Sequence, residues 1–332
     1  MSIKILNPGL FSTVQDLGRV GYQDQGFSTA GALDTYALRM GYTLIGNNGP
    51  AIEYTIVGPT IQFLTDNTFV LTGGQFEATL NNQVISSQTV IFVKKGDELK
   101  IGSVVDGARG YILFGKPLNI PKVANSYSTH TRSKIGGYKG RALKSNDVIT
   151  CQQNNMYAER IGLSCPVEAI NQQVIHIIEG PQIESFSNEA KQKLVNEGFK
   201  ISEKSDRMGF RLQGEKIAPI ESADIISEPV ALGSIQVPND GNPIILLNDK
   251  QTVGGYTKIA TVCAADLSLI AQKQPNETVK FEWITVEAAI EKLHQKERKL
   301  NEKQNEVLKA PIFDTSQMRK TSTRINKLLK GE

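Results

Sequence analysis

The 332-residue sequence is poor in the residues that build metal sites and disulfide frameworks. It holds three cysteines (Cys151, Cys165 and Cys263) and three histidines, and it lacks a CxxC pair. An odd number of cysteines without framework spacing fits a reducing compartment, so we expect a cytoplasmic protein whose cysteines are buried core residues. The scattered histidines argue against zinc and metal-dependent hydrolysis, and we expect no bound metal.

Long apolar segments and the common catalytic motifs are also missing. No run of about eighteen apolar residues occurs, and the N-terminus lacks the apolar core of a signal peptide. The chain contains no GxxxxGK[ST] motif and no visible Ser-His-Asp or Cys-His arrangement. The formal net charge of +3 is carried mainly by the lysine-rich C-terminal part. We therefore expect neither a membrane nor a nucleic acid as a partner.

Short β-rich segments separated by turn residues fill the region from Ile52 to Phe114. Many short strands at this spacing are typical of a barrel or sandwich. The stretch Gly58–Phe63 recurs as Gly180–Phe186, which indicates two related β domains in tandem. The aperiodic stretch Lys116–Ser126 favours a boundary between them. We predict a mainly β (α+β) protein with an N-terminal β-barrel-like domain (1–118), a second β-barrel domain (119–284), and a C-terminal helix with a basic tail (285–332).

Helical spacing of apolar residues appears at a few places only. The clearest pattern runs from Gly31 to Gly46, and a second follows Ser187, which is typical of an N-cap. A short helix is predicted at 266–271. From Thr285 onward a narrow apolar face repeats at helical spacing until Pro311. We expect this face to pack on the body of the protein or on a partner chain rather than on a membrane.

The segment from Gly233 to Tyr256 is the most informative part of the chain. Ile235 and Val237 alternate with polar residues, and a Pro-Asn-Asp-Gly turn at 238–241 leads to an apolar return strand. A run of donors and acceptors follows at 248–252, and Gly254-Gly255 permits close approach of the backbone to another group. Two interpretations stay open: a hairpin whose polar groups satisfy their own backbone, or the wall of a pocket.

Three further stretches carry polar groups suited to binding. In the first, VQDLGRVGY, Asp16 and Arg19 either pair with each other or line a pocket. In the second, Ser128–Arg141, glycines alternate with cations and predict an anion cradle, with a basic surface loop as the alternative. In the third, SDRMGFRL, the spacing of Arg207 and Arg211 places both on one face if the segment is extended.

Several of these stretches resemble the signature segments of one family. They are VQDLGRVGY, GALDTYALRMGYTLIGN, SDRMGFRL, IQVPNDGNPIILLNDKQTVGGYTKIA, and a match to the pattern STHxRxxxGGxxGR. From Leu6 to about Trp283 the chain is similar to the biotin-dependent carboxyltransferase-like family. That family includes the C subunit of 5-oxoprolinase, the Kip antagonist protein and the second half of the urea carboxylase carboxyltransferase region. The resemblance implies tandem cyclophilin-like β-barrels, in agreement with the internal repeat.

The chemistry of the candidate residues suits a neutral amide, lactam or ureido group bound beside an anion. Gln236 and Gln251 offer amide donors and acceptors, and arginines hold carboxylates or phosphates bidentately. Asp240 or Asp249 would move a proton if burial raised its pKa. The candidate catalytic residues are Asp249, Asp240 and Glu228. The candidate substrate-binding residues are Gln15, Asp16, Arg19, His130, Arg132, Arg141, Arg207, Arg211, Gln236, Gln251, Thr252, Gly254, Gly255 and Tyr256.

The resemblance implies three alternative functions. The favoured one is the C subunit of an ATP-dependent 5-oxoprolinase, which opens 5-oxoproline to glutamate. It would act with a B subunit that resembles the Kip inhibitor and with an A subunit, and the assembled complex would use ATP. The second is a carboxyltransferase subunit that moves a carboxyl group from carboxybiotin to a urea-like or amide substrate. Biotin would then be carried by another chain, because no AMKM-like segment occurs here. The third is a regulatory protein that antagonises a histidine-kinase inhibitor.

Overall fold

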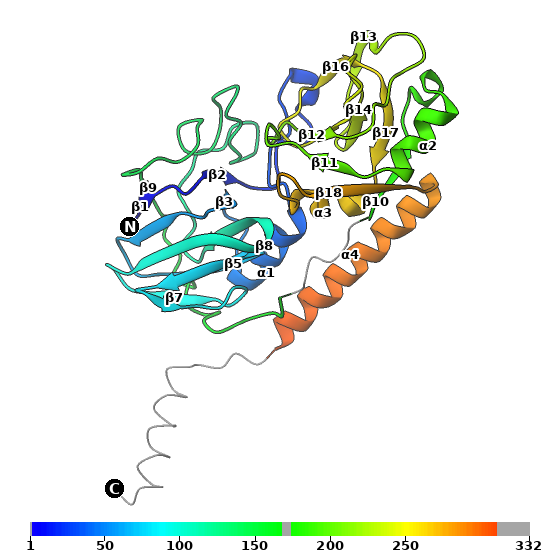
Figure 1. Cartoon of the computed structure of the whole chain (residues 1–332). Helices are drawn as coiled ribbons and strands as arrows, with labels where there is room; N and C mark the ends of the chain where they lie inside the picture. Colours follow the sequence, from blue (N-terminus) through cyan, green and yellow to red (C-terminus); the bar gives the residue numbers. More distant parts are fainter. Residues whose placement is uncertain (1, 168–173, 311–332) are drawn as a thin grey trace, which may run out of the picture.

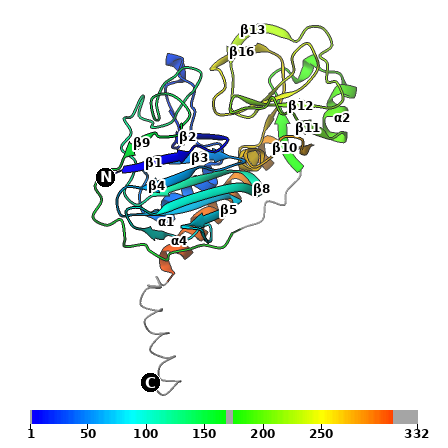
Figure 2. The same ribbon diagram turned by 60° about the vertical axis from the view of Figure 1, so that its left-hand side comes forward.

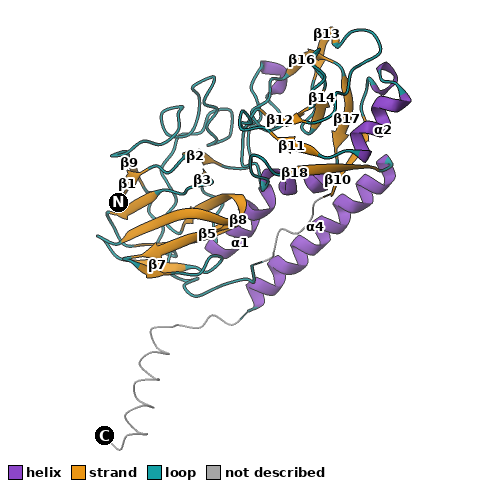
Figure 3. Ribbon diagram, in the orientation of Figure 1, coloured by secondary structure: helices purple, strands orange, loops and turns teal. Residues whose placement is uncertain are grey.

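Two β bodies lie side by side in the computed structural model, which describes residues 2–167 and 174–310 (Figure 1). The N-terminal body is a half-barrel sheet, the C-terminal body is a closed barrel, and one long helix runs along both. Strands dominate the structure and helices are few (Figure 3). The predicted mainly β architecture is therefore confirmed. The predicted basic tail from Pro311 to Glu332 lies outside the described residues.

The first sheet contains nine strands. They are β1 (Ser2–Asn7), β2 (Phe11–Gln15), β3 (Ala51–Thr55), β4 (Thr60–Phe63), β5 (Asn67–Leu80), β6 (Gln83–Val84), β7 (Ile91–Val93), β8 (Glu98–Phe114) and β9 (Val148–Thr150). The order is β2-β3-β8-β4-β1-β9, and β5 pairs with β6, β7 and β8. Each of the long strands β5 and β8 joins two segments that the sequence predicts as separate. The register of β5 shifts between Gly73 and Gln75, where the strand is irregular.

The second body closes into a barrel of seven strands. They are β10 (Val174–Glu179), β11 (Phe199–Ile201), β12 (Gly209–Gln213), β14 (Ser234–Gln236), β15 (Ile244–Leu246), β17 (Lys258–Val262) and β18 (Thr278–Trp283). A separate two-stranded sheet consists of β13 (Asp224–Pro229) and β16 (Val253–Tyr256). The predicted hairpin is the β14–β15 pair, in which Ile235 lies opposite Ile245. All three residues of β14 are buried.

The segment between the two bodies favours a later domain boundary than the predicted one. Strand β9 pairs antiparallel with β1, and Leu118, Ile120, Leu143 and Ile149 pack in the core of the first sheet. The prediction assigned residues 119–284 to the second domain because Lys116–Ser126 has no periodic pattern. The first barrel strand begins only at Val174. We propose that the boundary lies between residues 151 and 174.

Local capping signals explain where the helices begin and end. Helix α1 (Thr35–Ile45) starts after Asp34, whose Oδ1 accepts the N–H of Ala37 at 3.0 Å, and it ends at Gly46, whose φ is 82°. The other helical segments are η1 (Gln23–Gln25), η2 (Ile183–Ser185), α2 (Asn188–Asn196), η3 (Ala264–Asp266), α3 (Leu267–Ala271) and α4 (Val286–Lys309). Ser187 caps α2, as predicted.

Helix α4 ties the two bodies together. It begins beside the barrel and lies with α1 on one side of the first sheet (Figures 1 and 2). Leu300 and Val307 are buried in the hydrophobic cluster that α1 shares, so this part of the apolar face packs on the body, whereas Val286 and Ile290 are exposed. Both guanidinium Nη atoms of Arg39 donate to the carboxylate of Glu297, at 2.7 and 2.8 Å. None of the helices in the described ranges is long and apolar enough for a membrane crossing.

The side chain of Tyr54 closes the first core over a glycine. Tyr54 in β3 lies opposite Gly110 in β8, and a Cβ at position 110 would overlap the Tyr54 ring. The ring is fully buried and also packs edge-on against Phe76, with ring centroids 4.8 Å apart. It therefore has little freedom to move. A Cβ at Gly102, in the same strand, would have a carboxylate oxygen of Glu77 as its nearest atom, at 3.1 Å.

This contrast predicts different costs for the same substitution within one strand. Gly110→Ala should lower the free energy of unfolding by about 1–3 kcal/mol, because the buried ring and the backbone must shift. Gly102→Ala, the matched control, should change it by less than about 0.5 kcal/mol, because the Glu77 side chain moves easily. Urea unfolding measures both values. Equal costs for the two variants would contradict the tight packing of Tyr54.

Candidate functional site

A buried arginine connects the two β bodies. Arg207 precedes β12, and its Nε and Nη2 donate to the carboxylate of Asp249 at 3.1 and 3.0 Å. Its Nη1 donates to the carboxylate of Glu53 in β3, and its Nη2 also donates to the carbonyl of Gly31 at 2.6 Å. Burial by itself would lower the pKa of Arg207, but the charges of Asp249 and Glu53 raise it above its ordinary value. The guanidinium is therefore held charged between the domains.

Further hydrogen bonds fix the Glu53 side chain. Its Oε2 accepts the N–H of Leu33 at 2.9 Å and the hydroxyl of Tyr111 at 2.8 Å. The Tyr111 oxygen in turn accepts the N–H of Asp34 at 2.8 Å. Burial raises the pKa of Tyr111 well above its ordinary value, and the Glu53 and Asp34 carboxylates raise it further, so the phenol remains a neutral donor. The start of α1 is thus connected to the interdomain ion pairs.

Gln272 adds another bridge between the bodies. Its Nε2 donates to the carboxylate of Asp34 at 2.7 Å. Its Oε1 accepts the backbone N–H groups of Ala108 and Arg109 at 2.9 and 3.0 Å. Burial raises the pKa of Asp34. These links leave the two bodies with little freedom to rotate against each other.

A cavity of about 360 Å³ lies against this junction. Its lining comes from both bodies and includes three of the predicted residues, Arg132, Arg207 and Asp249. Phe210 contributes an apolar surface, and the guanidinium carbon of Arg109 lies 5.2 Å from the centre of its ring. The predicted His130 is buried nearby, with Nε2 3.3 Å from the carbonyl oxygen of Asp249. The structure therefore brings the second and third predicted stretches together, with Arg132 exposed beside the cavity.

Two amide side chains lie near Gly254 in strand β16. A Cβ at Gly254 would lie 2.6 Å from Nε2 of Gln236 and 3.5 Å from Nε2 of Gln251. Gln236 is 2% exposed, and its Nε2 has no hydrogen-bond partner among the residues that the structure describes. An unpaired buried donor costs about 1–3 kcal/mol, which a bound carbonyl oxygen would recover. The amide groups of Gln236 and Gln251 therefore both lie close to Gly254.

A lysine that the sequence analysis did not select lies in the same loop. Lys250 is 4% exposed, and its Nζ donates only to the carbonyl of Gln251, at 3.4 Å, among the described residues. Burial lowers the pKa of Lys250. Its backbone carbonyl accepts the hydroxyl of Ser28 at 2.7 Å, so the loop is attached to the first body. In the sequence, only the position of this lysine between Asp249 and Gln251 pointed to a site. The burial of one lysine within a polar run produces no pattern in the sequence.

The N-terminal candidates have structural partners. The Asp16 carboxylate accepts the hydroxyls of Ser126 and Ser128 at 2.6 and 2.5 Å, and the Arg19 guanidinium donates to the carbonyls of Val123 and Ser128. Neither of the two open interpretations describes this arrangement, because both side chains bind the 123–128 loop. Burial lowers the pKa of Arg19. Gln15 donates to Thr13 and Thr129 and accepts from Gly31.

Other candidates lie outside the cavity and the amide pair. Both Nη atoms of Arg141 donate to the carboxylate of Asp147 at 2.7 Å, so its guanidinium is already paired within the protein. Arg211 is exposed and does not line the cavity with Arg207. The two do not share a face because Arg207 lies in the turn before β12, where Oδ1 of Asp206 accepts the N–H of Met208 at 2.8 Å. The expectation of one extended face is therefore corrected.

The carboxylates proposed for proton transfer differ in their surroundings. Asp240 is exposed, and hydrogen bonds from Asn242 lower its pKa, so the burial that would raise it is missing. Hydrogen bonds from Lys258 and Gln182 lower the pKa of Glu228, and its ion pair with Lys258 measures 2.8 Å. Only Asp249 is buried, and both of its oxygens bind Arg207. These contacts favour a positioning role for Asp249.

The remaining candidates lie in or next to the two-stranded sheet of β13 and β16. Gly254, Gly255 and Tyr256 belong to β16, and the carbonyl of Thr252 accepts the N–H of Val230 at 3.0 Å. Tyr256 is partly exposed, and its carbonyl accepts Nζ of Lys258 at 3.2 Å. In the described ranges no group of His, Cys, Asp or Glu side chains is arranged to hold a metal ion, and all three cysteines are buried and outside disulfide bonds.

Comparison with known proteins identifies relatives of this architecture. Residues 25–283 match the family described as "Carboxyltransferase domain, subdomain A and B". The chain is 35% identical over 289 residues to the C subunit of 5-oxoprolinase from Haemophilus influenzae, covering 86% of this chain and 93% of that protein. It is 33% identical over 301 residues to the protein of the same name from Escherichia coli, covering 89% and 96%.

A solved structure shares the fold over most of the chain. The crystal structure of the Kluyveromyces lactis urea amidolyase superposes with a TM-score of 0.84 at 28% identity. The match covers 91% of this chain but only 20% of the urea amidolyase. The two β bodies therefore recur together, in the same arrangement, within a much longer protein.

The interdomain ion pairs predict a large effect for Arg207. Arg207→Met should lower the free energy of unfolding by about 3–5 kcal/mol, because it leaves two buried carboxylates without a counter-charge. Arg141→Gln, which breaks a partly exposed pair, should cost about 1 kcal/mol or less. Urea unfolding followed by the fluorescence of Trp283, the single tryptophan, measures both. Adding Asp249→Asn to Arg207→Met should restore part of the loss; a further loss would contradict the proposed cause.

The buried Lys250 predicts a pH-dependent gain of stability on substitution. Because folding lowers the pKa of Lys250, the unfolded chain binds more protons, and the contribution of this group to stability rises with pH up to the ordinary lysine pKa. Lys250→Met should therefore raise the free energy of unfolding by about 1 kcal/mol at pH 7. The gain should shrink as the pH rises toward the ordinary lysine pKa, about 10.4, in urea titrations. A less stable variant at pH 7 would show that the ammonium is well solvated by its neighbours.

Proposed function

Since the chain belongs to the family "Carboxyltransferase domain, subdomain A and B", we propose that it is the C subunit of a multi-subunit, ATP-dependent 5-oxoprolinase. The observation that carries the proposal is the similarity to two proteins of that name along 93% and 96% of their length. The letter in the name implies further subunits. The complex would open the lactam of 5-oxoproline to glutamate, with ATP used by the assembled subunits.

The amide pair is suited to the lactam. The unpaired Nε2 of Gln236 would donate to the lactam carbonyl oxygen, and Gln251 would offer a second amide near Gly254. A hydrogen bond to that oxygen stabilises the negative charge that develops on it when water adds to the carbonyl carbon. The C–N bond then breaks, and the ring nitrogen takes up a proton as it leaves as the amine of glutamate.

The neighbouring charged groups complete the assignment. Lys250 is the cation in the same loop with the weakest set of partners, and it would pair with the carboxylate of 5-oxoproline. Asp249 holds the loop by its two bonds to Arg207 and does not contact the lactam in this scheme. The residue that transfers the proton would come from a companion polypeptide, because Asp240 and Glu228 are held ionised by their hydrogen bonds.

The likeness to urea amidolyase favours a second candidate, a carboxyltransferase role within a larger assembly. A ureido group presents the same carbonyl oxygen and N–H groups as a lactam, so the amide pair fits the ring of biotin as well. Biotin would be carried by another chain in that case. A regulatory protein that antagonises a histidine-kinase inhibitor is the third candidate, and it would not need the unpaired donor of Gln236.

Reconstitution with the companion subunits tests the first candidate. The protein, its partner subunits, ATP and 5-oxoproline should together form glutamate and ADP, and omission of this chain should abolish the reaction. Gln236→Leu should lower kcat about 100-fold, because a donor to the developing oxyanion is lost. Glutamate release measured by a coupled assay reports both results. No turnover by correctly folded, associated subunits would reject the proposal.

A matched substitution separates site chemistry from folding. Gln213 lies in β12 of the same barrel and is exposed, so Gln213→Leu should leave kcat unchanged. Gln251→Ala should raise KM or lower kcat without lowering the free energy of unfolding, because its side chain is exposed. Equal activity of Gln251→Ala and the parent protein would remove Gln251 from the site.

A further inference from the structure

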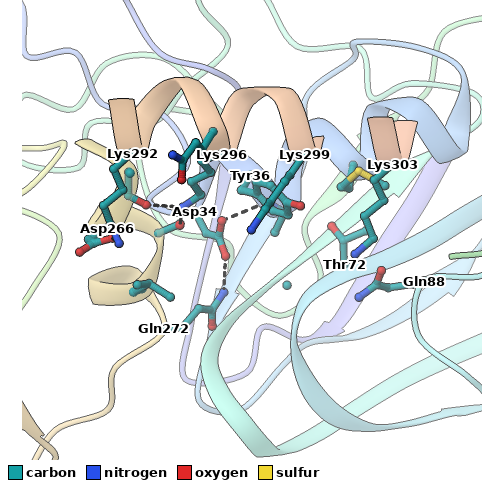
Figure 4. A pocket seen from close by; sticks show the side chains of 17 residues that line it. Asp34, Tyr36, Thr72, Gln88, Asp266, Gln272, Lys292, Lys296, Lys299 and Lys303 are labelled. Carbon is teal, nitrogen blue, oxygen red and sulfur yellow. Dashed lines mark hydrogen bonds and ion pairs between the residues drawn. The ribbon is translucent and has the colours of Figure 1, made fainter. Parts of the chain in front are cut away.

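A second cavity, remote from the amide pair, is lined by a row of lysines. It has a volume of about 520 Å³ and lies between α4, α1, β5 and the η3–α3 segment (Figure 4). It shares no lining residue with the interdomain cavity. The lysines follow the spacing i, i+4, i+7 and i+11 along α4, which places them on one face of the helix. They are Lys292, Lys296, Lys299 and Lys303.

The opposite wall contains a buried hydroxyl that lacks a partner. Thr72 in β5 is 2% exposed, and its Oγ1 makes no hydrogen bond among the residues that the structure describes. Figure 4 shows Lys303 extending from α4 toward Thr72 and Gln88. A hydroxyl rarely stays unpaired in the interior, because the desolvation of the group is not offset. The position of Thr72 on the cavity wall points to a ligand atom that completes its hydrogen bonding.

The charge balance of this cavity is positive. Its two carboxylates, Asp34 and Asp266, already have partners: Asp34 accepts from Gln272 at 2.7 Å, and Asp266 contacts His176 at 2.6 Å. Lys292 lies 3.6 Å from Asp266, whereas the ammonium of Lys299 has no hydrogen-bond or ion-pair partner among the described residues. The cavity therefore offers donors in excess of acceptors, an arrangement that selects anions.

The burial of one lysine strengthens this interpretation. Nζ of Lys296 donates to the carbonyl of Ala265 and the hydroxyl of Ser268 and lies 5.5 Å from the centre of the Tyr36 ring. Burial lowers the pKa of Lys296. A bound anion would offset that desolvation, because an opposite charge favours the protonated amine.

From the lysine row, the unpaired Thr72 hydroxyl and the cavity between them, we propose that this site binds a di- or triphosphate group. Lys296, Lys299 and Lys303 extend along about 10 Å of helix axis, which suits a chain of linked phosphates better than one small anion. The Thr72 hydroxyl donates to one phosphate oxygen. The bound group would also attach α4 to β5, so the ligand stabilises the docking of the helix that joins the two bodies. The inference does not depend on the proposed reaction.

Calorimetric titration of the full chain with sodium tripolyphosphate, at constant ionic strength, tests the proposal. Saturable binding with one site per chain is expected. The double variant Lys299→Gln/Lys303→Gln should weaken binding at least about tenfold, because two ammonium donors are lost. Thr72→Val, which removes only the hydroxyl, should weaken it about tenfold. Absence of saturable binding by the folded parent protein would overturn the proposal.

A matched charge control distinguishes the site from general attraction. Arg298 and Lys309 lie on α4 outside the cavity, and both are exposed. Arg298→Gln/Lys309→Gln removes the same charge and should leave the affinity unchanged. Equal weakening by both double variants would show that binding reflects net charge, and would reject the site.

A parallel titration with ATP identifies the source of the phosphate group. Tighter binding of ATP than of tripolyphosphate, lost in Lys299→Gln/Lys303→Gln, would indicate a nucleotide. Equal affinities would show that only the phosphate chain is recognised. Binding of ATP that both double variants leave intact would place the nucleotide elsewhere, and would contradict its recognition by this cavity.

Discussion

The bonds of Arg207 to Glu53 and Asp249 are the constraint on which the arrangement of this protein depends. One guanidinium is shared by a strand of the half-barrel and a loop of the closed barrel, with the carbonyl of Gly31 as a third anchor. Buried ion pairs contribute little net stability compared with apolar packing, but they define geometry strictly, since any displacement leaves a buried charge unpaired. We therefore regard this junction as a device that sets the position of one body against the other.

The position of the barrel loop follows from that junction. Asp249 is held by Arg207, Asn248 donates to the carbonyls of Ala30 and Ala32 at 3.1 and 3.0 Å, and the carbonyl of Lys250 accepts the Ser28 hydroxyl. Three consecutive residues are thus attached to the first body or to the junction. Gln251 and Gly254 follow directly in the chain, so the amide pair is aligned by interactions that it does not make itself. Helix α4 adds a separate connection to the first body, through the ion pair between Arg39 of α1 and Glu297 of α4.

Local features of the fold were predictable, and partners remote in sequence were not. The hairpin turn at 238–241 and the N-cap Ser187 follow from rules that involve a few neighbouring residues. The joining of separate segments into β5 and β8 was missed, because a long bent strand still contains turn residues. No spacing rule relates Glu53 to Arg207, since 154 positions separate them. The prediction of a shared face for Arg207 and Arg211 assumed an extended segment, and a turn at Asp206 invalidates it.

The incompletely paired groups of this structure argue for ligands more strongly than its cavities do. Arg207, Glu53 and Gln272 have several well-formed hydrogen bonds each, whereas five buried side-chain atoms of the described residues have no partner. Against that background, the unpaired amide of Gln236 and the hydroxyl of Thr72 are exceptions among the described residues that lower stability. Both lie beside groups suited to one chemical class: a second amide next to Gln236, and lysines next to Thr72. Leaving polar groups without partners at such places lowers the stability of the free protein and keeps those groups available to a ligand.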